Sequence, residues 1–78
     1  MVEWWSYEPL TLVIVDGGHR CRYTPDFVTV SAGSITCYEV KGFLREAARI
    51  RFLAARERYP FFVFTMIRRV KDGWEVML

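Results

Sequence analysis

The first half of the chain is a series of short apolar runs separated by turn residues. Residues 10–15 are rich in β-branched side chains and lead into an Asp-Gly-Gly turn, which is a strong hairpin signal. Residues 21–30 predict the returning strand. A Ser-Ala-Gly-Ser turn follows, and residues 35–41 predict a third strand that ends on charge. We therefore expect a three-stranded antiparallel meander.

The second half changes to a helical period. Apolar residues recur at spacings of four, four, three and four, in the stripe Leu44, Ala48, Phe52, Ala55 and Tyr59. This stripe predicts an amphipathic helix over residues 44–59, ended by Pro60. Residues 61–66 predict a strand covered on both faces, with its phenylalanines in the core, and residues 67–78 predict a final hairpin or strand extension.

These elements run in the order βββαββ and predict an α/β fold. We expect a mixed sheet of about four or five strands with one main helix packed on it. The length of 78 residues limits the chain to one small domain and excludes large cofactor-binding folds. Hydrophobic residues make up 53% of the chain and charged residues 26%, which is typical of a globular protein.

Cysteine usage and hydropathy bear on the compartment. Cys21 and Cys37 form no CxxC pair, so we expect free, buried thiols and no zinc site. Residues 1–8 are aromatic and acidic, unlike a signal peptide, and the longest uncharged run, residues 31–38, is too short to span a bilayer. We expect a cytoplasmic protein with no membrane contact.

Three charged residues interrupt strands that otherwise carry apolar groups. Asp26 follows Pro25 within the second predicted strand, where the proline indicates an edge position or a bulge. Glu39 and Lys41 lie two apart in the third strand, so they share one face and Val40 takes the other. The meander sets the strand of Asp26 beside that of Glu39, so two carboxylates and one ammonium converge at one end of the sheet.

Two adjacent carboxylates repel, and a divalent cation between them removes that repulsion. A site with few protein oxygens suits Mg²⁺, which keeps several waters and also binds phosphate. A lysine beside it can orient water or stabilise developing negative charge. Because no activated nucleophile is evident, this chemistry favours hydrolysis of phosphodiesters by water. A cross-strand charge cluster on a solvent face is the alternative interpretation.

The chain resembles the PD-(D/E)XK nuclease superfamily. The resemblance rests on Pro25-Asp26 and, twelve residues later, Glu39-Val40-Lys41, in the contexts TPDFV and YEVKGF and followed by an arginine-rich segment ending in RYP. It covers roughly residues 7–78 and is closest in character to small phage and prophage endonucleases, which are related to restriction enzymes and junction resolvases. It implies one nuclease-like domain over residues 1–78 with a restriction-endonuclease-like minimal core, acting in the cytoplasm of a bacterial host.

The resemblance also implies residue roles. Asp26, Glu39 and the Val40 carbonyl would bind Mg²⁺, with Mn²⁺ as a substitute, and Lys41 would be the catalytic lysine. Relatives usually have a helix with a further acid before the first strand, and here that acid is dispensable, is Glu8, or comes from another protomer. The substrate would be DNA, branched, flapped or nicked, because so small a surface leaves little room to read sequence.

Net charge is +2, but arginines gather between residues 45 and 68. Arg45, Arg49 and Arg56 share a helix face that either contacts DNA phosphates or is simply solvated. Arg20 and Arg22 share a strand face with the same two interpretations. The aromatic N-terminal segment, Trp4, Trp5 and Tyr7, packs on the sheet, forms a homodimer contact or stacks on an unpaired base.

Two other functions fit the same sequence. In one, the fold is a non-catalytic nucleic-acid-binding or assembly subunit that lacks the upstream helix. In the other, the chain completes a larger nuclease and cleavage needs a second protein. The endonuclease interpretation, as a homodimer acting on DNA, is the one the spacing of Asp26, Glu39 and Lys41 favours.

Overall fold

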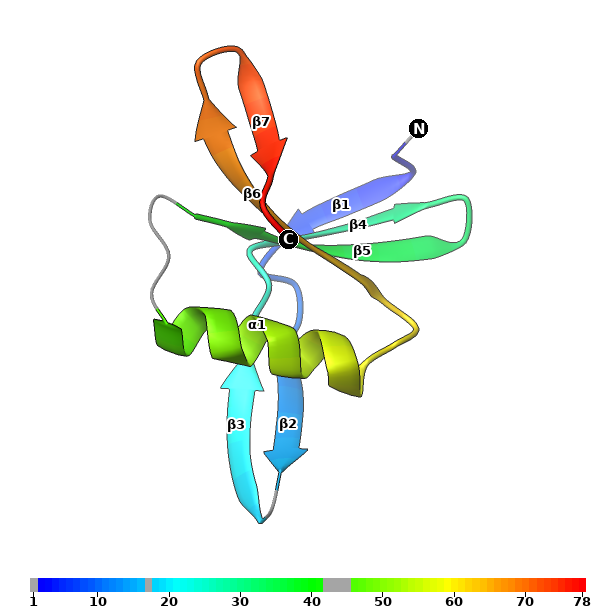
Figure 1. The fold of residues 1–78 in the computed structure, drawn as a ribbon. Coiled ribbons are helices and arrows are strands. Elements are labelled where there is room, and N and C mark those ends of the chain that lie inside the picture. The colour runs from blue at the N-terminus through cyan, green and yellow to red at the C-terminus, as the bar shows by residue number, and fades with distance from the viewer. Residues whose placement is uncertain (1, 17, 42–45) are drawn as a thin grey trace.

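The computed structural model describes residues 2–16, 18–41 and 46–78. Seven strands and one helix are formed by these residues, in two sheets (Figure 1). Their bounds are β1 Trp4–Tyr7, β2 Leu12–Asp16, β3 His19–Tyr23, β4 Phe27–Ser31, β5 Ser34–Val40, α1 Glu46–Arg58, β6 Val63–Val70 and β7 Gly73–Val76. The chain is thus a small α/β domain, as the sequence predicts.

The larger sheet is mixed and has the strand order β1-β4-β5-β6-β7. All neighbours are antiparallel except β5 and β6, which α1 connects and which run parallel. Strands β2 and β3 form a separate hairpin on the far side of α1 (Figure 1). The helix therefore lies between the face of the main sheet and this hairpin, and it contacts β2, β3 and β6.

The predicted meander and the order βββαββ are wrong in one respect. The strand expected over residues 21–30 is two strands, β3 and β4, which end up in different sheets. Pro25 explains the break, because it has no N–H to give to a strand ladder and it is buried where the chain turns. The place beside β4 is taken by β1, so the N-terminal aromatic segment is an edge strand of the main sheet. The pairing of β4 with β5 is as predicted.

The core fills the space between the main sheet and α1. Phe52 and Ala55 of the predicted helical stripe are fully buried, and Phe52 packs edge-on against Tyr23 and Phe64. Leu44 and Arg45 lie outside the described residues, and the helix ends at Arg58, two residues before Pro60. The buried hydrophobic set is Leu12, Ile14, Tyr23, Val28, Cys37, Phe52, Ala55, Phe64 and Met66.

The opposite side of the main sheet has no second layer among the described residues. We call this side the open face, and its residues include Trp5, Phe27, Tyr38, Val40, Ile67 and Trp74. The prediction of a strand at residues 61–66 covered on both faces is therefore wrong, as β6 is covered by α1 on one face only. Phe61 precedes this strand and is 89% exposed, and Cys21, also predicted to be buried, is exposed.

Cys37 is buried as predicted. It lies on the helix-facing side of β5, and burial raises the pKa of its thiol to about 11. The final hairpin of β6 and β7 is also as predicted, with Val70 paired to Gly73 across the turn. None of the helices formed by the described residues is long and apolar enough to cross a membrane.

The β4–β5 turn holds one strained residue. Ala32 and Gly33 join Ser31 to Ser34, and both have positive φ, 50° and 79°. Positive φ at both central residues is the signature of the type I′ turn, which matches strand twist and favours Asn-Gly. Ala32 is therefore the wrong residue for its backbone, because its Cβ crowds the following carbonyl in this region.

We predict that Ala32→Asn stabilises the domain by about 0.5–1 kcal/mol, since asparagine tolerates the left-handed region. Urea unfolding followed by circular dichroism measures this change. Ala54→Asn in the middle of α1 is the control and should destabilise through helix propensity. A loss of stability in Ala32→Asn would contradict the assigned turn.

Candidate active site

Asp26, Glu39 and Lys41 come together on the helix-facing side of the main sheet. The β4–β5 ladder ends at the pair Phe27–Tyr38, and one further step in this register sets Asp26 opposite Glu39. Residues so paired have Cβ atoms about 4.5–5.5 Å apart. Glu39 and Lys41 share the face of buried Cys37, whereas the Val40 side chain lies on the open face.

Asp26 replaces the rung at which the ladder stops. Its Oδ2 accepts the Val40 N–H at 2.8 Å, in the place where a backbone carbonyl would continue the ladder. The same register sets Pro25 opposite Val40, and Pro25 has no N–H to donate to the Val40 carbonyl. The end of regular pairing thus fixes a carboxylate and a main-chain carbonyl side by side.

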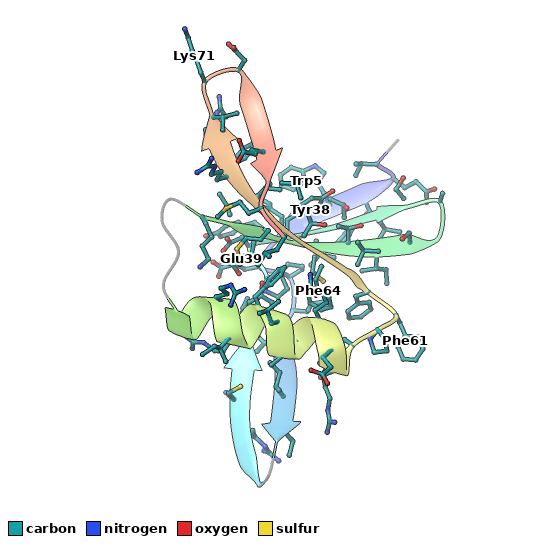
Figure 2. The ribbon with its side chains drawn as sticks, viewed as in Figure 1. Trp5, Tyr38, Glu39, Phe61, Phe64 and Lys71 are labelled. Atoms are coloured by element: carbon teal, nitrogen blue, oxygen red, sulfur yellow. The ribbon has the colours of Figure 1, made fainter. Side chains whose placement is uncertain are left out.

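Glu39 is held from two sides in the layer between sheet and helix (Figure 2). The Tyr23 hydroxyl donates to Glu39 Oε1 at 2.6 Å, and Lys41 Nζ lies 3.2 Å from Oε2. The two side chains of the Lys41–Glu39 pair are only 16% and 11% exposed, so the pair is shielded from water. Lys41 is also fixed through its main chain, whose N–H donates to the Ile67 carbonyl at 2.9 Å.

The environment raises the pKa of Glu39. Burial is the largest cause, because it disfavours the charged carboxylate, and the nearby charge of Asp26 acts in the same direction. The Tyr23 hydrogen bond and Lys41 oppose them without cancelling them. Burial and the bond to Glu39 also raise the pKa of Tyr23, so its hydroxyl remains a donor at neutral pH. The carboxylate pair is therefore a site of stored charge repulsion.

A cleft opens beside these groups. It is lined by Arg22, Tyr23, Thr24, Glu39, Lys41 and Arg51. Arg22 and Arg51 are exposed, and neither forms an ion pair with a side chain that the structure describes. The cleft therefore has three cationic side chains around one carboxylate, which suits an anionic ligand.

The arginines predicted to bind DNA lie differently. Arg45 is outside the described residues. Arg49 is half-buried, and the Arg56 guanidinium lies 5.9 Å from the centre of the Phe52 ring. Neither Arg49 nor Arg56 lines the cleft, whereas Arg51 does. Helical spacing grouped Arg49 with Arg56, which identifies a shared face but not the face that meets the site.

Tyr23 was missed by the sequence interpretation. It looks like one more aromatic residue in a β-strand, and its partner is sixteen residues away in another sheet. The one available signal was its place next to Thr24-Pro25-Asp26, because a residue beside a strand break lies close to the residue that ends the neighbouring ladder.

The upstream acid expected from the resemblance does not join the pair. The Glu8 N–H donates to the Asp26 carbonyl at 2.8 Å, but the Glu8 carboxylate bonds to Tyr7 and thereby raises the pKa of that hydroxyl. Within residues 2–16, 18–41 and 46–78 there is no group of three or more His, Cys, Asp or Glu side chains placed to share a metal ion. The site has two carboxylates and one ammonium.

Comparison of the chain with protein-family models, with curated proteins and with solved structures finds no match.

The raised pKa of Glu39 predicts a pH dependence of stability. A raised pKa in the folded state means that folding favours the protonated carboxyl, so this contribution is complete below the unfolded value of 4.5 and is lost as pH rises through the folded pKa. Glu39→Gln removes the titration. We expect its free energy of unfolding, relative to wild type, to rise as pH increases from 4.5 and then level off.

Urea unfolding at a series of pH values measures this difference. Glu75→Gln is the matched control, since Glu75 forms the exposed ion pair with Arg68, at 2.8 Å. Its effect should be within about 1 kcal/mol. A wild type that gains stability over Glu39→Gln as pH rises would show that the partners of Glu39 outweigh its burial.

Proposed function

We propose that this protein is a metal-dependent endonuclease that hydrolyses phosphodiester bonds in DNA. The observation that carries the proposal is the convergence of Asp26, Glu39 and Lys41, from two adjoining strands, at the end of the β4–β5 ladder. The resemblance to PD-(D/E)XK nucleases supports it, because the motif residues lie on paired strands followed by a helix and a parallel strand. A restriction-endonuclease-like minimal core is the finer fold that we propose.

The donor set fits a hard divalent cation. Asp26 and Glu39 offer carboxylate oxygens, and the Val40 carbonyl is a third oxygen at the point where Pro25 offers it no N–H. The raised pKa of Glu39 reflects repulsion and burial that a cation between the carboxylates would relieve. Mg²⁺, or Mn²⁺ in its place, would polarise the phosphate and lower the pKa of water.

Lys41 is the residue that we assign to the attacking water. Its ammonium is held against Glu39, so its direction is fixed before substrate arrives. From there it would orient the water and stabilise the charge that develops on the phosphate. Arg22 and Arg51, on the walls of the same cleft, would hold the flanking phosphate. They take the role that helical spacing predicted for Arg45, Arg49 and Arg56.

The substrate that we propose is branched, flapped or nicked DNA. The chain has 78 residues, and a single cleft of this size contacts backbone rather than a run of bases. We further propose that residues 1–78 act as one nuclease domain, as a homodimer, without a membrane partner and in the cytoplasm of a bacterium that carries the phage or prophage.

A second function is favoured by the bonds that Glu39 already makes. Both its carboxylate oxygens have partners, Tyr23 and Lys41, and the described residues supply no third acid. A non-catalytic nucleic-acid-binding or assembly subunit would retain this arrangement as a structural link. Such a subunit would be indifferent to EDTA, and a subunit that completes a larger nuclease would cleave only when the second chain is added.

Cleavage tests the proposal. Plasmid, single-stranded and four-way-junction DNA are incubated with the purified protein in Mg²⁺, Mn²⁺ or EDTA. We expect metal-dependent cutting that falls by about 10²–10⁴-fold in Asp26→Asn and Lys41→Ala. Asp72→Asn and Lys71→Ala, in the exposed β6–β7 turn (Figure 2), are controls that remove the same charges elsewhere.

Two outcomes contradict the assignment. Cleavage that persists equally in Lys41→Ala points to a contaminant and removes the role given to this lysine. Cleavage that EDTA leaves unchanged removes the metal.

Binding of DNA without cutting tests the arginines. Fluorescence anisotropy in EDTA with a junction oligonucleotide should show weaker binding for the double variant Arg22→Ala/Arg51→Ala. The slope of log K against log salt should fall by about 0.9 for each phosphate that the variant no longer neutralises. Arg20→Ala/Arg58→Ala, two exposed arginines on the same two elements, is the control. Equally weakened binding in both double variants would mean that net charge, not the cleft, binds DNA.

A further inference from the structure

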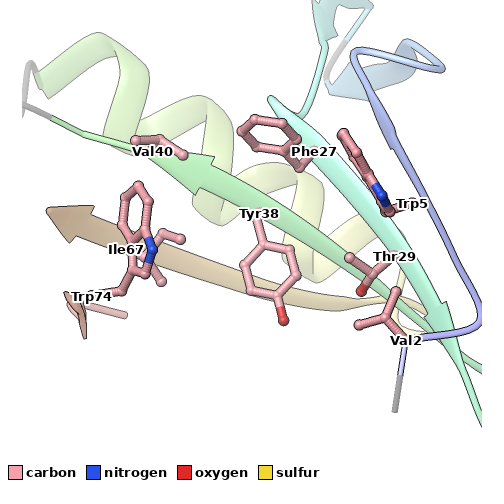
Figure 3. A pocket seen from close by; sticks show the side chains of 8 residues that line it. All are labelled: Val2, Trp5, Phe27, Thr29, Tyr38, Val40, Ile67 and Trp74. Atoms are coloured by element: carbon pink, nitrogen blue, oxygen red, sulfur yellow. The ribbon is translucent and has the colours of Figure 1, made fainter.

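The open face is the largest feature that the proposed function does not use. Figure 3 shows its rings: Trp5 and Trp74 lie at the two ends, with Phe27 and Tyr38 between them. They line a hollow of about 280 Å³ whose exposed surface is apolar. Trp5 is 64% exposed and Trp74 is 52% exposed. Contiguous aromatic surface of this kind marks an interface in a soluble protein.

The central strands are apolar on both faces. In β5, Cys37 faces α1 whereas Tyr38 and Val40 face the open side, and Ile67 of β6 joins them there. A strand of a two-layer domain exposes polar side chains on its uncovered face, and strands that are apolar on both faces belong to three-layer arrangements. The pattern therefore requires a layer on the open face.

We propose that this layer is a second copy of the chain, packed open face to open face. The strand order makes β5 the middle strand, so a two-fold axis along β5 sets β1 of one copy over β7 of the other and β4 over β6. Trp5 of each copy then meets Trp74 of its partner. The two sheets form an aligned sandwich, as two inner faces of similar twist do.

The area suits such a contact. A five-stranded sheet with strands about 4.8 Å apart and a rise of about 3.3 Å per residue presents a flat footprint of roughly 400–500 Å². Two copies cover roughly twice that area, which reaches the approximately 1,000 Å² that a specific interface needs. The β6–β7 hairpin rises on the side away from α1 (Figure 1), so in the pair it would lie along the partner's β1 edge.

Charge favours the same axis. The segment around β1, residues 2–8, carries Glu3 and Glu8 and no basic residue. In the β6–β7 hairpin, Glu75 is paired with Arg68, which leaves Arg69 and Lys71 against Asp72. An axis along β5 brings this net positive edge to the acidic β1 edge of the partner. An axis across the strands would instead set like charges together.

Sedimentation equilibrium over a concentration series tests the inference and involves no DNA, so its result is independent of the nuclease proposal. Wild type should be a reversible dimer. Trp5→Lys and Trp74→Glu should each weaken the dimer by at least about tenfold, because each buries an unpaired charge in the contact. Ile50→Lys on α1 and Phe61→Lys, both at exposed apolar positions, are controls that should leave the dimer unchanged.

Mixing the two variants sharpens the test. If Trp5 meets Trp74, then Trp5→Lys and Trp74→Glu should recover association as a heterodimer, with circular dichroism showing that each variant is folded. A wild type that is monomeric up to about 1 mM overturns the proposal. So does a dimer that neither variant weakens, or a monomer whose tryptophan fluorescence is quenched by single-stranded oligonucleotides, because nucleic acid would then occupy the face. Failure of the mixture to associate overturns the axis along β5.

Discussion

The hydrogen bond from the Tyr23 hydroxyl to Glu39 holds the two sheets of this protein in register. It is 2.6 Å long and buried, and it joins the last residue of the β2–β3 hairpin to the middle strand of the main sheet. A hydrogen bond to a charged group contributes about 1.5–3 kcal/mol, and a buried carboxylate without one costs at least as much. Because Tyr23 also packs on Phe52 and Phe64, this contact fixes the helix, the hairpin and the carboxylate together.

The site lies where regular backbone pairing stops. Pro25 ends the β4–β5 ladder, and the Asp26 carboxylate takes the Val40 N–H that the ladder would otherwise have satisfied. A local break in the sheet thus supplies a fixed acidic side chain with no extra element to hold it. Its energetic cost is visible in Glu39, whose pKa is raised by burial first and by the charge of Asp26 as well.

The parts of the fold that depend on local pattern were predictable from the sequence. The alternation in β5 placed Glu39 and Lys41 on one face, the stripe through Phe52 and Ala55 identified the buried side of α1, and the Lys-Asp-Gly turn indicated the last hairpin. Choices between distant partners were not predictable. Pro25 signalled an edge or a bulge, but nothing near it indicated that the chain leaves one sheet for another there.

The same limit applies to the site. Asp26, Glu39 and Lys41 were found by spacing along strands, whereas Tyr23, Arg22 and Arg51 reach the cleft through the way the hairpin and α1 dock on the sheet. Helical period grouped Arg49 with Arg56 but could not indicate which turn of α1 lies next to Lys41. The open face was also missed, because the sequence of an apolar strand is the same whether one or both of its sides are covered.

Val40 belongs to both sides of the sheet at once. Its side chain lines the hollow of the open face, and its N–H holds the Asp26 carboxylate. Anything that packs on the hollow restricts the backbone on which the acidic pair depends, and anything that orders the acidic pair prepares the hollow. Such linkage is reciprocal by thermodynamic necessity. A strand only one residue thick therefore gives this small domain a built-in means for one surface to report the occupancy of the other.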